Sequence, residues 1–120
     1  YYAGDALLMM QNNPDLAFVV PDEGTNLFVD AMCIPKGAAN KENAELFINF
    51  MCDTEIALKN MAVTCYATPV RTAFEALDEE TRNNKIMFPD DEVLNRTQIY
   101  KNLPPETLNL YDQLWVKLKS

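Results

Sequence analysis

The sequence predicts an α/β fold in which short apolar strands alternate with helices, and three observations indicate this class. Two runs rich in β-branched and aromatic residues, LAFVV (16–20) and NLFVDAMCIP (26–35), are typical of buried strands. Beyond residue 40, apolar residues recur at the three- and four-residue spacing of a helix face. Strands followed by helical segments are the pattern of layered α/β proteins, so we expect that architecture.

The first 37 residues are expected to hold a helix and two strands. A turn at Gly4 leads into an apolar helical segment at 6–10 capped by Asp5, which indicates that the chain begins inside a larger fold. The strand at 16–20 follows, and PDEGT (21–25) is a turn or linker. The strand at 26–35 comes next, and Pro35 and Gly37 end it.

The remainder of the chain is predominantly helical. Asn40 starts a helix with an apolar stripe, and Asp53 caps a second helix that ends near Val63. The two stripes are Ala44, Phe47, Ile48 and Met51, and then Leu58, Met61 and Ala62. An extended stretch (63–70) precedes short helices at 71–77 and from Asp90. Pro104 and Pro105 open a last helix with its stripe at Tyr111, Leu114, Trp115 and Leu118, in which Trp115 is expected to be core.

Composition limits the function classes. With 120 residues, 48% apolar and 23% charged, the chain suits one soluble domain of ordinary size. No apolar run reaches the roughly 18 residues of a membrane span, and no signal peptide opens the chain, so any export signal was removed or lies outside these residues. The net charge of −8 disfavours binding to a phosphate backbone and favours a cationic partner.

The cysteines do not match a metal site. Cys33, Cys52 and Cys65 form no CxxC pair, and the chain has no histidine, the commonest partner of cysteine at zinc. They are either three small buried apolar residues or include a Cys33–Cys65 bridge, if the segments that carry these two are neighbours.

No familiar catalytic motif is present. The sequence lacks a P-loop, GxGxxG, GxSxG and HExxH, and without histidine no Ser-His or Cys-His pair can form within it. An enzyme is therefore disfavoured.

One residue conflicts with the strand at 26–35. Asp30 would share a strand face with Phe28, roughly 7 Å away, and an unpaired buried carboxylate costs several kcal/mol. Either the aspartate lies at a strand edge, accepting hydrogen bonds from backbone or lysine, or it meets a cation in a binding site. The residues alone leave both alternatives open.

An ordered set of short motifs resembles a known family. YAGDA, PDEGTNLFVDAMCIPKGAANKENAELFINFM, CYATPV and FPDDEV occur in the order and near-constant spacing found in the C-terminal third of the spermidine/putrescine-binding proteins of bacterial polyamine ABC importers. The resemblance spans almost all 120 residues. No single motif is specific, so the resemblance depends on the set.

This resemblance implies a receptor for a polyamine that delivers its ligand to a membrane permease, with no reaction and no cofactor. It implies the C-terminal part of a two-lobed fold of the periplasmic-binding-protein type II class. Residues of about 1–21 and 86–120 would belong to one lobe and about 30–85 to the other, with a hinge crossing at 22–29. The location would be extracytoplasmic, either periplasmic or held by a lipid anchor on the outer face of the cell membrane.

The resemblance also implies five ligand-binding residues. Asp30 matches the carboxylate that holds a ligand amine, and Phe28 matches an aromatic residue two positions earlier that is usually tryptophan. Tyr2 matches a second aromatic residue that is usually tryptophan, Tyr66 the tyrosine of a Tyr-x-Thr-Pro turn, and Gln98 a glutamine, if a short deletion is allowed. Phe28 and Tyr2 are smaller than the tryptophans usual at these two positions of the binding site, which leaves open which amine is preferred.

Other interpretations remain at this stage. Phe28 could be plain core and Tyr66 could cap a turn through its hydroxyl, while Met9 and Met10 are expected to fill gaps in the core. The alternatives for the function are a two-lobed receptor for a different solute and an enzyme completed by upstream residues. For residues 1–120 alone, the resemblance implies weak ligand binding and a dimer or strand exchange through uncovered apolar surface.

Overall fold

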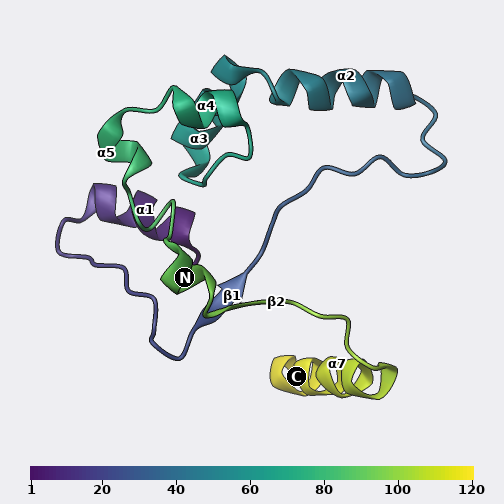
Figure 1. Ribbon diagram of the computed structural model, residues 1–120. Coiled ribbons are helices and arrows are strands. Elements are labelled where there is room, and N and C mark those ends of the chain that lie inside the picture. Colours follow the sequence, from purple (N-terminus) through teal and green to yellow (C-terminus); the bar gives the residue numbers. More distant parts are fainter.

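The computed structural model describes residues 1–120 and has a mixed α/β fold, as expected (Figure 1). Seven helices and two short strands follow in the order α1 (Ala3–Asn12), β1 (Thr25–Leu27), α2 (Lys41–Met51), α3 (Thr54–Thr64), α4 (Arg71–Glu75), α5 (Glu79–Arg82), α6 (Asp91–Leu94), β2 (Thr97–Ile99) and α7 (Pro105–Lys119). None of the helices combines the length and apolar character that a membrane crossing requires.

The two strands form a parallel pair that joins distant parts of the sequence. Thr25, Asn26 and Leu27 lie opposite Thr97, Gln98 and Ile99. Parallel strands need a long crossover, and here helices α2 to α6 lie within it. Strand β2 was not among the strands predicted from the sequence.

Both predicted core strands are wrong in their extent. Residues 16–20 are irregular, and of the run 26–35 only its first two residues lie in β1. A strand persists only where neighbouring backbone satisfies its N–H and C=O groups, and no segment of this chain pairs with 16–20 or 28–35. Asp30 is consequently exposed, so it does not bear the cost of an unpaired buried carboxylate.

The helix starts agree well with their cap residues, with one exception. The Asp53 side chain accepts hydrogen bonds from the backbone N–H of Glu55 at 2.9 Å and Ile56 at 3.3 Å, which confirms it as the cap of α3. Asp90 likewise caps α6. The capping role predicted for Asp5 is wrong, because α1 already begins at Ala3 and Asp5 lies in its first turn.

The buried part of the molecule is small. Six residues are buried, all of them small except Met61, and they come from α1, from α3 and its C-terminal end, and from α4: Gly4, Ala6, Ala57, Met61, Cys65 and Ala73. Of the predicted stripe of α3, Met61 is buried, Leu58 is half-buried and Ala62 is exposed, so the buried face runs through Ala57 and Met61.

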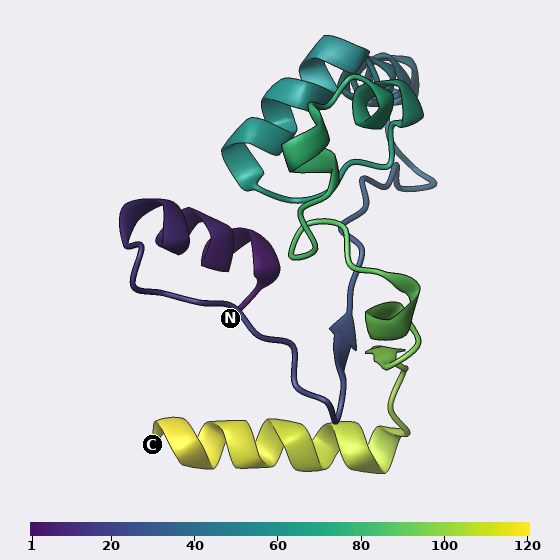
Figure 2. The same cartoon turned by 60° about the vertical axis from the view of Figure 1, so that its left-hand side comes forward.

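Helices α2 and α7 contribute no buried residue. Figures 1 and 2 show α7 standing apart from the other helices, and Trp115, expected in the core, is 58% exposed. Met9 is also exposed, and Met10 is half-buried. The radius of gyration of 18.2 Å exceeds the roughly 14 Å of a compact domain of this length. Amphipathic patterning is present in both helices, but neither apolar stripe is fully buried among the described residues.

The three cysteines are all free. Cys33 and Cys52 are exposed, whereas Cys65 is buried, so the chain forms no Cys33–Cys65 bridge in this structure. The expectation of three buried cysteines therefore holds only for Cys65, whose sulfur accepts a long 3.9 Å hydrogen bond from Gln11.

A glycine turn makes the strand pair possible. Gly24 has φ +109°, and a Cβ at this position would lie 2.3 Å from the carbonyl oxygen of Arg96. The next residue, Thr25, donates its backbone N–H to that same oxygen at 3.4 Å. Only glycine combines this backbone conformation with so close an approach.

We therefore expect Gly24→Ala to destabilise the protein by about 2–3 kcal/mol, because the methyl group must push β1 away from Arg96. Thermal unfolding of the complete protein measures the loss. Gly37→Ala is the matched control, since a Cβ there meets nothing within 4 Å. Equal melting temperatures for the two variants would contradict the role assigned to Gly24.

Candidate functional site

Three aromatic rings from separate parts of the chain form a row. The ring of Tyr2 lies edge-on to Phe28 with centroids 5.0 Å apart, and Phe28 lies edge-on to Tyr66 at 6.0 Å. Edge-to-face packing at these distances is favourable, because the positive edge of one ring meets the negative face of the next. The structure therefore brings together three of the five ligand-binding residues expected from the sequence.

Local backbone structure positions each ring. Tyr2 is the N-terminal cap residue of α1, and its carbonyl accepts the N–H of Ala6 at 2.9 Å. Phe28 directly follows β1, so the strand pair fixes where its backbone starts. Tyr66 follows Cys65, which ends α3 in a left-handed conformation with φ 57° and turns the chain toward α1.

Gly4 allows α1 to approach Tyr66. A Cβ on Gly4 would lie 2.6 Å from the Tyr66 ring and 2.7 Å from the Thr64 carbonyl oxygen. The sequence indicated a turn at Gly4, but this residue is buried inside α1. Its missing side chain is what lets the helix pack against the turn that carries Tyr66.

Two carboxylates act on the Tyr66 phenol. The pKa of Tyr66 is raised first by burial and then by the negative charges of Asp5 and Asp30, which oppose loss of the phenolic proton. Both aspartates are exposed. Neither belongs to an ion pair, since the two ion pairs of the structure are Lys41–Glu45 and Arg96–Asp22.

Asp5 is the residue that the sequence reasoning missed. The sequence predicts Asp5 as the cap of the first helix, whereas it lies in the first turn of α1, which begins directly after Tyr2. The usable signal was its nearness in sequence to Tyr2, which was already a candidate. Asp5 adds a second negative charge that, like that of Asp30, raises the pKa of Tyr66.

Gln98 is not joined to the aromatic row. It lies in β2 opposite Asn26 and is exposed, and no hydrogen bond of its side chain connects it to Tyr2, Phe28 or Tyr66. Asn26 precedes Phe28 by two residues, so Gln98 lies near the backbone segment that carries Phe28.

The arrangement suits an organic cation. Aromatic faces attract a cation within about 6 Å, with about 0.5–2 kcal/mol per contact, and carboxylates accept charge-assisted hydrogen bonds from ammonium groups. No group of three or more potential metal ligands occurs among residues 1–120.

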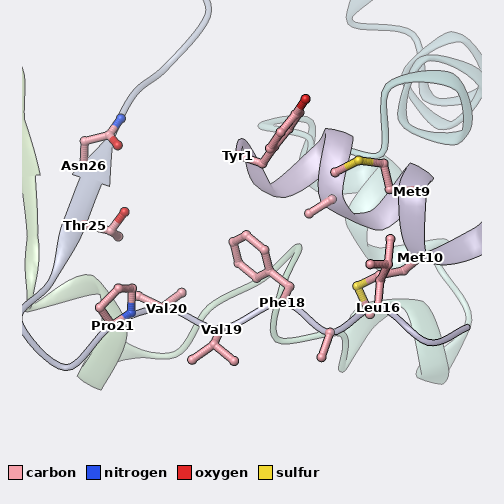
Figure 3. Close-up of a pocket in the computed structure, with 12 residues that line it drawn as sticks. Tyr1, Met9, Met10, Leu16, Phe18, Val19, Val20, Pro21, Thr25 and Asn26 are labelled. Atoms are coloured by element: carbon pink, nitrogen blue, oxygen red, sulfur yellow. The ribbon is translucent and has the colours of Figure 1, made fainter. Parts of the chain in front are cut away.

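One hollow lies elsewhere, between α1 and the segment that leads to β1. Its volume is about 520 Å³, and no charged side chain lines it. Figure 3 shows Phe18 pointing toward α1 across this space, with Val19 directed away from the helix. An apolar lining without charged groups is a poor match to a charged solute.

Comparison with known proteins finds one family. Residues 4–97 match the family model of the bacterial extracellular solute-binding proteins. The putrescine-binding periplasmic protein SpuD of Pseudomonas aeruginosa is 30% identical over 110 residues, which are 92% of this chain and 30% of that protein. The spermidine/putrescine-binding periplasmic protein of Escherichia coli is 30% identical over 117 residues, 98% of this chain and 33% of that protein.

Solved structures of similar proteins agree with this family assignment. A structure from Listeria monocytogenes, whose name refers to a spermidine/putrescine ABC transporter, has a TM-score of 0.87 and 39% identity, over 98% of this chain and 36% of that one. The substrate-binding protein PotD of Streptococcus pneumoniae has a TM-score of 0.78 and 38% identity, over 97% of this chain and 36% of that one. The chain thus spans about a third of the length of these proteins.

The electrostatics of the row lead to a titration test. Replacing Asp5 by Asn removes the larger of the two carboxylate effects on Tyr66, so the pKa of Tyr66 should fall toward its ordinary value, and Asp30→Asn should lower it less. Because the chain has five tyrosines, the change is measured from the NMR signals of the Tyr66 ring between about pH 9 and 12. Asp15→Asn, which removes the same charge from an exposed loop, should leave Tyr66 unchanged. A Tyr66 titration that is the same in all three variants would contradict this electrostatic arrangement.

Proposed function

This chain belongs to the bacterial extracellular solute-binding proteins, and we propose on that basis that it is part of a receptor that captures a polyamine for an ABC importer. Family membership places the chain outside the cytoplasm, as expected from the sequence. The curated relatives are binding proteins, which confirms the expectation that the chain is not an enzyme. The observation that carries the proposal is the aromatic row with Asp5 and Asp30 beside it.

The proposed ligand matches this chemistry. A polyamine is an apolar methylene chain with ammonium groups at fixed spacing, so it needs aromatic walls along the chain and carboxylates at the charges. Tyr2, Phe28 and Tyr66 would provide the walls, and Asp30 would bind an ammonium group. A charge-assisted hydrogen bond of this kind contributes about 1.5–3 kcal/mol.

The remaining polar groups would hold the rest of the ligand. Asp5 contributes to the raised pKa of Tyr66, and it would bind the same ammonium group as Asp30 or a neighbouring one. Gln98, near the backbone segment that carries Phe28, would hydrogen-bond to the ligand only when the site closes further.

We also propose that residues 1–120 form the C-terminal part of a two-lobed fold. In this assignment 1–21 and 86–120 belong to one lobe, 30–85 belong to the other, and 22–29 is the hinge crossing. The aromatic row supports the assignment, because Tyr2 would come from the first lobe, Phe28 from the crossing and Tyr66 from the second lobe. A ligand held by all three rings would close the cleft, and the closed receptor would dock on a membrane permease.

The main test is calorimetric titration of the complete protein with putrescine and with spermidine, beside an Asp30→Asn variant. The protein should bind at least one amine, and the variant should lose roughly 2 kcal/mol or more of binding free energy, about the worth of a buried charge partner. Asp15→Asn is the charge-matched control and should bind like the unsubstituted protein.

Two results would count against the proposal. If neither amine binds, the polyamine is the wrong solute. If Asp30→Asn binds as well as the unsubstituted protein, Asp30 is a solvent-exposed aspartate without a ligand.

The uncovered apolar faces yield a second test. Residues 1–120 produced alone should associate into dimers or exchange strands, because α2 and α7 expose Phe47, Leu114 and Trp115 by more than half. The same chain should bind polyamine weakly or not at all. Light scattering measures the association, and a stable monomer whose melting temperature rises with spermidine would disprove the expectation.

A further inference from the structure

Arg96 ties the start of β2 to the turn that precedes β1. Its Nη1 donates to the Pro21 carbonyl oxygen at 3.3 Å and to the Asp22 carboxylate at 3.2 Å. Its own carbonyl oxygen accepts the backbone N–H of Thr25 at 3.4 Å. One residue therefore holds both ends of the turn from residue 21 to 25, through its side chain and its backbone.

The hold of Arg96 on the turn from residue 21 to 25 depends more on where Arg96 is packed than on its ion pair with Asp22. The Asp22 side chain is fully exposed, and an exposed ion pair contributes little because water and salt screen it. The Arg96 side chain is only 30% exposed, and its Nε is buried without a partner. The packing at Gly24 leaves no room for the turn to move toward Arg96.

The β1–β2 pair and the turn held by Arg96 lie directly before the proposed ligand residues. The strand pair ends at Leu27 opposite Ile99, and the next residue is Phe28, with Asp30 two positions further. No strand pairing supports residues 28–35. Segments without such backbone pairing change conformation at a lower free-energy cost than paired ones, so bending of the crossing is favoured after Leu27.

We propose that Arg96 is a positioning residue for the amine site: it fixes the first half of the hinge crossing, so that Phe28 and Asp30 start from one place. The inference rests on the proposed function and adds a determinant of affinity that does not touch the ligand. When Arg96 holds the turn, the Phe28 ring stays 5.0 Å from Tyr2 and 6.0 Å from Tyr66 before the ligand arrives. A preformed site binds more tightly, because less conformational entropy is lost on binding.

The test compares Arg96→Gln with Asp22→Asn in the complete protein. Arg96→Gln should raise the dissociation constant for putrescine or spermidine about tenfold. Asp22→Asn should change it by less than about twofold, because the guanidinium keeps its bond to the Pro21 carbonyl and the exposed pair contributes little. If Arg96→Gln does not fold, Arg96→Met replaces it, since methionine keeps much of the apolar length of the side chain but has no group that donates to the Pro21 carbonyl and Asp22.

Hydrogen exchange without ligand separates positioning from simple stabilisation. Backbone amides of residues 25–27 should exchange faster in Arg96→Gln, while the amides of α3 stay as protected as in the unsubstituted protein. Faster exchange at 25–27 together with weaker binding supports the proposal. A lower melting temperature with an unchanged dissociation constant would overturn it, as would unchanged exchange at 25–27.

The same experiment keeps the two proposals apart. If the unsubstituted protein binds neither amine, the polyamine function fails, and the exchange data alone decide whether Arg96 fixes the crossing. If the unsubstituted protein binds an amine and Arg96→Gln binds it equally well, the function stands and the role of Arg96 is wrong.

Discussion

Pairing between β1 and β2 holds residues 25–27 beside residues 97–99, and the positions of the candidate site residues follow from it. The pair depends on Gly24, because any larger residue would collide with the Arg96 carbonyl oxygen and force the strands apart. Phe28 leaves the end of β1, while Tyr66 lies within the long crossover between the strands. The ring of Phe28 meets those of Tyr2 and Tyr66 because this joint fixes where residue 28 begins.

The second close approach, between α1 and the turn after α3, gives the site its charge. Gly4 lets α1 come near Tyr66, and this brings Asp5 of the same helix toward the phenol that also feels Asp30. Two carboxylates beside aromatic rings disfavour an anion and favour a cation with an apolar body. The relatives named for putrescine and spermidine fit that chemistry.

Sequence reasoning succeeded where structure is local. The caps at Asp53 and Asp90 need only the two or three residues that follow them, and the last helix begins at Pro105 as its proline pair indicated. It failed for 16–20 and 28–35, where apolar content predicted strands that have no pairing partner among these residues. It also missed β2 and read Gly4 as a turn. Both depend on contacts with residues far away in the sequence, which no local pattern records.

The sequence by itself determined the mixed α/β class and the family, and it predicted four residues of the candidate site, because family motifs and helix periodicity are written in consecutive residues. Tyr2, Phe28, Asp30 and Tyr66 were all expected from that resemblance. The structure packs the three rings together, and the charge of Asp30 raises the pKa of Tyr66. Only the tertiary structure decided that Asp30 is exposed, that the charge of Asp5 also raises the pKa of Tyr66, and that Arg96 holds the turn before β1. Those features depend on the distance between residues that are far apart in the chain, and such distances are set by backbone pairing and by the space that two glycines leave empty.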